Sequence, residues 1–232
     1  MKIVIYFKGS ILKDDKPAVH AKDVRRYIGS IVSDKYKKLF LWHESSPAPF
    51  LYLKPHKDCF EILTYREDMS DAIEHIIARV TLNPEIKLNG VSLEVERVRV
   101  KNDRFAVIEE GKFRYRTRTP IIIGASKTEH AIYNSIKDDE EKLKEFTTKC
   151  ILDSVKYQIK QYFDFDFEAV EDGIILYHNL DHFTVKHYHG DGFEWRPAVW
   201  CDFTCSYSLP QTVGYKNGLG FGQIIKSKNQ RN

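Results

Sequence analysis

"VGYKNGLGFGQIIKSK", residues 213–228, places four glycines within nine residues and then continues as an apolar stretch interrupted by lysines. Glycine is used where the backbone needs a positive φ or lies very close to another group. The stretch does not match the phosphate-binding pattern GxxxxGK[ST], and it leads into a strand pattern rather than a helix. It therefore predicts a tight loop before the last strand of the fold.

The first hundred residues carry the pattern of one small α+β unit. Apolar or alternating residues predict four strands, at residues 2–7, 49–54, 59–65 and 91–100. Apolar residues three and four positions apart predict two helices, at residues 24–32 and 73–80, and Asn83-Pro84 ends the second. The resulting order of strand, helix, strand, strand, helix, strand is that of the ferredoxin-like unit.

The second half of the chain starts this pattern again. A helix is predicted over residues 139–162, and strands over residues 112–123, 172–178, 182–189, 198–208 and 222–228. This order fits a second, modified ferredoxin-like unit. We therefore predict an α+β fold of two tandem ferredoxin-like (βαββαβ) domains, residues 1–101 and 102–232.

Composition and charge indicate a protein with a local basic region. The chain has 36 basic and 33 acidic residues, yet residues 213–232 contain no Asp or Glu. Such an imbalance indicates a basic patch. The four cysteines form no CxxC pair, so we expect buried thiols. With no apolar run near the roughly 20 residues of a membrane span, we expect a cytoplasmic protein.

The glycine stretch resembles the C-terminal glycine-rich loop of the RAMP superfamily, whose members are CRISPR-associated RNA-binding proteins. The chain is most similar to the endoribonucleases that cut CRISPR repeats to process precursor guide RNA. Three further stretches carry this resemblance, which covers most of the chain: residues 78–100 (ARVTLNPEIKLNGVSLEVERVRV), 133–143 (YNSIKDDEEKL) and 39–47 (LFLWHESSP). The ending Gly218–Gly222 is specific to the superfamily where it closes a double ferredoxin-like pattern.

The resemblance implies RNA cleavage without a metal ion or any other cofactor. The ribose 2′-OH would attack the adjacent phosphate and leave a 2′,3′-cyclic phosphate and a 5′-OH end. The implied partner is CRISPR repeat RNA, with effector-complex proteins and a second copy of the chain as further partners left open, and no membrane. The alternative is a RAMP protein of an effector complex that binds CRISPR RNA without cutting it.

Three residues are candidates for catalysis. His43 lies where the family carries its catalytic histidine, with a surface-loop histidine as the alternative. His20, at the start of the first helix, is a second candidate because histidine exchanges protons near neutral pH. The family's tyrosine and lysine positions fall near Gly29 or Ser30 and near Pro49, so neither residue is matched. Tyr27 is the nearest tyrosine, although it lies on the predicted apolar face.

The predicted RNA contacts are basic side chains and loop glycines. Arg25 and Arg26 are predicted on the polar side of the first helix. Lys112, Arg114, Arg116 and Arg118 alternate onto one strand face, as an RNA-contacting row or as charges that protect an edge strand. In and around the loop, the candidates are Gly214, Lys216, Gly218, Gly220, Gly222 and Lys226. His187 and His189 could share a metal, but no third ligand has a defined spacing, so no metal site is predicted.

Overall fold

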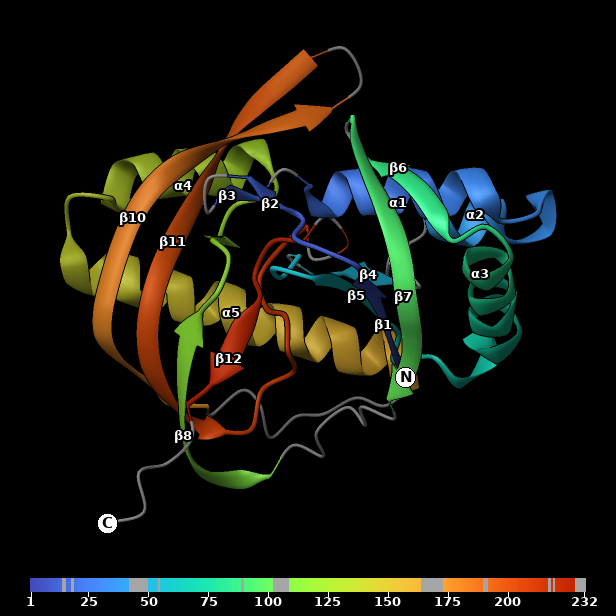
Figure 1. The fold of residues 1–232 in the computed structure, drawn as a ribbon. Coiled ribbons are helices and arrows are strands. Elements are labelled where there is room, and N and C mark those ends of the chain that lie inside the picture. Colours follow the sequence, from blue (N-terminus) through green and yellow to red (C-terminus); the bar gives the residue numbers. More distant parts are fainter. Residues whose placement is uncertain are drawn as a thin grey trace. The chain divides into compact units, whose positions relative to one another are not determined.

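The computed structural model describes residues 1–13, 16–17, 19–41, 50–53, 55–88, 90–101, 109–163, 173–189, 192–216, 218 and 220–227. The chain divides into two compact units, one of residues 1–105 with 218–220 and the other of residues 106–217 with 221–232. Each unit contains a twisted antiparallel sheet with helices (Figure 1). The predicted joint after Lys101 adjoins residues 102–108, which lie outside the described part, so it stays a prediction.

The first unit has the strand order of a ferredoxin-like sheet. Its elements are β1 (Lys2–Phe7), β2 (Leu12–Lys13), β3 (Lys16–Pro17), α1 (Ala21–Ile31), α2 (Asp34–Leu41), β4 (Leu51–Tyr52), β5 (Cys59–Leu63), the 3-10 turn η1 (Glu67–Met69), α3 (Ser70–Leu82), β6 (Glu85–Leu88) and β7 (Val91–Lys101). The sheet runs β4-β5-β1-β7-β6 with antiparallel neighbours. The four predicted strands and two helices are all present, and α3 ends before Asn83-Pro84 as predicted.

Apolar periodicity explains why α1 and α3 cover this sheet. Val24 and Ile28 of α1 and Ile76 and Val80 of α3 are at most 1% exposed. They pack in one cluster with Ile5 and other side chains of β1. This burial supplies most of the stability of such short helices.

The second unit repeats the strand order. Its elements are β8 (Glu110–Thr117), β9 (Ile121–Ile122), α4 (Lys127–Ile136), α5 (Glu140–Phe163), β10 (Ile175–His189), β11 (Gly192–Tyr207) and β12 (Ile224–Lys226). The sheet runs β10-β11-β8-β12, the same order as in the first unit. The predicted strands 172–178 and 182–189 form one strand, β10, because pairing with β11 continues through a register shift between Tyr177 and Asn179.

The glycine stretch occupies the place of the second ferredoxin-like helix. In the first unit α3 lies between the third and fourth strands of the repeat, whereas no α-helix forms among the described residues between β11 and β12. The loop therefore has to return the chain to the sheet edge beside β8, where Ile224 pairs with Thr117. Under this loop, the apolar side of α5 contributes Ile151 and Val155 to the core.

The four cysteines of the chain, one in the first unit and three in the second, are free and buried as predicted.

The helices of the described part include none that combines the length and the apolarity needed to cross a membrane.

Candidate functional site

His20 occupies the N-terminal end of α1. Its backbone N–H donates to Asp23 Oδ2 at 2.9 Å, and the Asp23 N–H donates to the His20 carbonyl at 2.9 Å. These two bonds satisfy groups that a helix start otherwise leaves unpaired, and they fix the backbone of His20. The residue itself is exposed, so its imidazole is accessible on a rigid support.

The two arginine candidates of α1 differ in their exposure to solvent. Arg26 is exposed as predicted, but Arg25 is only 9% exposed, so its predicted place on the polar side is wrong. Burial lowers the pKa of the Arg25 guanidinium, which lies close enough to the Tyr52 phenol to interact electrostatically. Small residues one turn away on either side, Ala21 and Gly29, are buried on the same stripe and leave room for the long side chain.

Tyr27 packs against the core of the first unit and is half-buried. Burial raises its pKa to about 12. The phenol therefore stays protonated at neutral pH, where it can donate a hydrogen bond but is a poor base. His43 lies in residues 42–49, outside the described part of the chain, and its catalytic role stays a prediction.

The basic row of β8 lies on the open face of the second sheet. Lys112, Arg114 and Arg116 are exposed, whereas the intervening Tyr115 is 2% exposed and faces the core. The predicted alternation is thus correct for these three residues. Arg118 lies one residue beyond the end of β8 and is only partly exposed, unlike the three preceding basic residues.

An acidic partner lies opposite this row. Asp202 of β11 accepts two hydrogen bonds from Arg114, from Nε at 3.0 Å and from Nη2 at 2.9 Å. The hydrogen bond from Arg114 lowers the Asp202 pKa and outweighs the opposing effect of burial, and the charge of Arg116 adds to it. The charges of Arg114 and Asp202 are therefore mutually compensated, while Arg116 stands directly opposite Asp202 in the strand register.

Other exposed side chains complete the open face. His178 Nε2 is hydrogen-bonded to Thr204 Oγ1 at 2.7 Å, and Trp200 is 37% exposed two positions from Asp202. Cations, an aromatic ring and hydrogen-bonding groups on one sheet are what single-stranded nucleic acid requires. Sequence reasoning missed Asp202. The alternation of Cys201 and Phe203 toward the core could have placed it on this face, but only the strand register brings it to Arg114.

The glycines at both ends of the loop use their backbone groups within the unit. Gly214 has a φ of +76° and donates its buried N–H to Ser154 Oγ at 2.7 Å. The Gly222 N–H donates to the Pro120 carbonyl at 2.8 Å, and its carbonyl accepts from Val213 at 2.8 Å. Neither amide is available to an RNA phosphate, so for these two glycines the geometry favours a role in turn formation.

The remaining loop candidates are more varied. Lys216 has a positive φ of 60° and is exposed, and Gly220, with a φ of +88°, is buried. Gly218 is described only as a partly buried residue between them. Lys226 pairs across from Tyr115, which places it on the opposite face from Arg114, and its Nζ lies 3.9 Å from the Phe113 ring centroid. The predicted RNA-contacting residues therefore do not all lie on one face of the second sheet.

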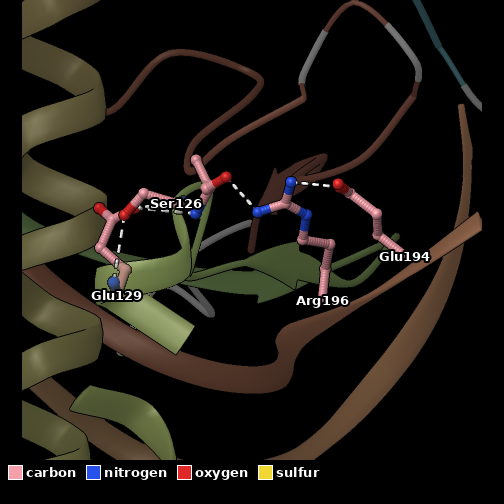
Figure 2. A network of polar contacts seen from close by, with 5 residues as sticks. Ser126, Glu129, Glu194 and Arg196 are labelled. Carbon is pink, nitrogen blue, oxygen red and sulfur yellow. Dashed lines mark hydrogen bonds and ion pairs between the residues drawn. The ribbon is translucent and has the colours of Figure 1, made fainter. Parts of the chain in front are cut away.

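Glu129 links the loop to the start of α4. Its Oε1 accepts from the Tyr215 hydroxyl at 2.6 Å, and its Oε2 accepts from the backbone N–H groups of Ala125 and Ser126 at 2.9 and 2.8 Å. Figure 2 shows Glu129 and Ser126 beside Arg196, which donates to the Ala125 carbonyl and pairs with Glu194. The carboxylate thus anchors Tyr215 of the loop while it caps the helix.

The anchor should depend on pH. Burial alone would raise the Glu129 pKa, but hydrogen bonds from Tyr215, Ser126 and Ala125 lower it below its ordinary value of 4.5. A lowered folded-state pKa contributes stability above the unfolded pKa, and this stability is lost as pH falls through the folded pKa.

Glu129→Gln is expected to cost on the order of 1 kcal/mol at pH 7, since hydrogen bonds to a charged group are replaced by weaker ones. Urea unfolding at several pH values should show that the difference in unfolding free energy between the variant and the wild type shrinks below about pH 4. Glu141→Gln, at an exposed residue of α5, is the control and should change little. A difference that persists unchanged at low pH would contradict the role of the carboxylate charge.

Among the described residues, no group of three or more His, Cys, Asp or Glu side chains is arranged to hold a metal ion.

Comparison with solved structures identifies the fold. A crystal structure of Cas6b matches with a TM-score of 0.71 and 15% identity, over 98% of this chain and 100% of that one. A RAMP protein described as binding different RNA substrates matches with a TM-score of 0.61 and 15% identity, over the same shares. A Cas6 product complex matches with a TM-score of 0.64 and 16% identity, over 97% and 98%.

These similarities confirm the predicted fold class and, at the level of the fold, the resemblance to Cas6-type RAMP proteins. No protein-family model matches the sequence, and no curated protein matches it.

Proposed function

We propose that this protein is an endoribonuclease that cuts CRISPR repeat RNA to produce guide RNAs. The observation that carries the proposal is the likeness to Cas6b over nearly the whole chain, which takes in both ferredoxin-like units. The exposed cations of β8 support it, because they supply the charge that an RNA backbone requires.

The proposed reaction needs no group beyond the chain and its RNA. A base removes the proton of the ribose 2′-OH, O2′ forms a bond to the adjacent phosphorus, and the bond from phosphorus to O5′ breaks. An acid gives a proton to O5′, so the products are a 2′,3′-cyclic phosphate and a 5′-OH. We assign the proton transfers to His43 and His20, because neutral imidazole and imidazolium coexist near pH 7.

The neighbours of His20 on α1 fit supporting roles. Arg26 is exposed on the same helix and carries the positive charge that can stabilise the phosphorane-like transition state. Tyr27, protonated because its pKa is about 12, can donate a hydrogen bond in such a site but is a poor base. Arg25 is too buried for direct contact with a phosphate and would act through packing.

A second candidate function is RNA binding without cleavage. It is favoured by two observations: a RAMP protein known for binding RNA has the same fold, and the family's tyrosine and lysine positions near Ser30 and Pro49 are not matched. Both functions would use the same basic face, so only a cleavage assay separates them.

The test is cleavage of end-labelled RNA containing the repeat of the neighbouring CRISPR array, in EDTA. We expect cleavage by the wild type, a cyclic phosphate end, and no cleavage of RNA carrying a 2′-deoxy substitution at the cut site. Tight binding without cleavage would support the second function, and neither binding nor cleavage would overturn both.

Asp202→Asn is expected to tighten binding of repeat RNA about two- to fivefold, since it removes a competing anion from the basic face and releases Arg114. The measurement is Kd at several salt concentrations, with a steeper salt dependence expected for the variant. Asp139→Asn is the matched control, because Asp139 also pairs with a cation, Lys142 at 2.8 Å, away from this face. Weaker binding by Asp202→Asn would mean that Asp202 instead positions Arg114 for the RNA.

A further inference from the structure

Strands β10 and β11 continue together beyond the rest of their sheet (Figure 1). The central strand β8 pairs with β11 at residues 202–207, and β9 pairs with it at residues 198–199. Further along, residues 192–196 pair only with residues 185–189 of β10 among the described strands. This segment, which we call the ribbon, is two strands wide, so both of its faces need some form of cover to be stable.

One face of the ribbon is attached to the second unit. His187 is 7% exposed, and its ring centroid lies 6.3 Å from that of Phe221 in the glycine loop. On the same face, Arg196 donates to the Ala125 carbonyl before α4 and pairs with Glu194 (Figure 2). The ribbon is therefore held in a defined position by the loop and by the start of α4.

The other face carries an exposed aromatic pair. Phe193 is 50% and Trp195 is 51% exposed, although both belong to the large apolar residue types that fold stability favours burying. Their ring centroids are 6.1 Å apart at an interplanar angle of 90°. Lys186, directly opposite Trp195 in the register, holds its Nζ 3.7 Å from the Phe193 ring centroid. The two rings and the ammonium group thus form one compact cluster.

The charge of this face restricts what can cover it. Lys186, Phe193 and Trp195 are its described side chains, and their only charge is positive. A nucleotide provides a flat base for an aromatic ring and a phosphate for the ammonium group. An apolar protein surface would bury the rings but would offer no anion to the ammonium group.

We propose that Phe193, Trp195 and Lys186 form a stacking subsite for one unpaired nucleobase of the RNA, with Lys186 contacting a neighbouring phosphate. The subsite rests on the proposed function. It also extends that function, since it makes a single-stranded nucleotide part of the recognised substrate. Stacking of this kind tolerates any base, because every base has a π face.

The experiment measures Kd for repeat RNA with a 2′-deoxy cut site, for wild type and three variants. Trp195→Ala should weaken binding about 5- to 150-fold, the range for loss of one base–aromatic stack, and Trp195→Phe should restore most of it. Tyr157→Ala removes a comparably exposed ring on α5, at 39%, and should leave Kd unchanged. Circular dichroism of each variant checks that the unit is folded.

An abasic scan of the same RNA locates the stacked nucleotide. At the stacked position, removal of the base and Trp195→Ala should each weaken binding, and the two together should weaken it no further than either alone. At every other position of the RNA, the two losses of binding free energy should be additive. If the wild type binds and cuts but Trp195→Ala binds equally well, the subsite is overturned and the proposed function stands. If Trp195→Ala instead dissociates a dimer in sedimentation with unchanged Kd, the face is an interface between copies. If the wild type binds no RNA, both proposals fail.

Discussion

His43→Ala is expected to slow cleavage of repeat RNA about 10²- to 10⁴-fold, the usual contribution of a positioned general acid or base. Alanine removes the proton-transferring group but little of the charge that binds RNA, so Kd should change far less than the rate. Single-turnover cleavage with excess enzyme measures the chemical step apart from product release. We expect a bell-shaped dependence of this rate on pH in the wild type, as two histidines working as acid and base would give.

His56→Ala is the matched control, since His56 is a histidine of the first unit with 44% of its side chain accessible. It should cut at the wild-type rate. His20→Ala should also slow cleavage and should remove one limb of the pH profile. Full activity of His43→Ala would exclude its assigned role and would leave His20 as the remaining histidine candidate on α1.

The alternation and helical periodicity of the sequence predict most strands and helices of both units, because long elements such as β7 and α5 display their period. They do not predict the burial of Arg25, since a charged residue is expected to face solvent. Ala21 and Gly29, small residues four positions away on either side, were the available signal. The sequence also carries a signal for α4, the capping pattern Ser126-Lys-Thr-Glu129.

Other features depend on the fold and have no local signal. Arg114 and Asp202 are 88 residues apart, and the register of β8 with β11 alone makes them partners. The aromatic pair Phe193 and Trp195 belongs to an ordinary alternating strand, and its exposure follows from the place where β8 stops pairing. Periodicity predicts which residues share a face, but it does not predict which faces are covered.

Gly214→Ala is expected to destabilise the second unit by about 2–5 kcal/mol, through two separate effects. At a φ of +76° any residue with a Cβ is strained, at a cost of roughly 1–2 kcal/mol. A Cβ at this position would also lie 2.5 Å from Ile121 Cγ2 and 2.8 Å from the Ile122 carbonyl oxygen, and overpacking typically costs about 1–3 kcal/mol. For a unit of this size we expect the Tm to fall by roughly 5–15 °C.

The steric part of this cost cannot be relieved by a small backbone shift. Ser154 accepts the Gly214 N–H at 2.7 Å, and the Ile122 carbonyl that the Cβ would strike accepts the Tyr215 N–H at 3.0 Å. Moving the backbone away from Ile122 would break one of these bonds. The loop is thus fixed at the point where it turns away from α5 and β9.

Gly90→Ala separates the two effects. Gly90 has a φ of +79°, nearly that of Gly214, but no atom lies within 4 Å of where its Cβ would be. Urea unfolding followed by circular dichroism should therefore show about 1–2 kcal/mol of loss for Gly90→Ala and clearly more for Gly214→Ala. Equal losses would show that the loop absorbs the added methyl group. In that case the glycine would not be required for packing, and its positive φ alone would explain why position 214 is glycine.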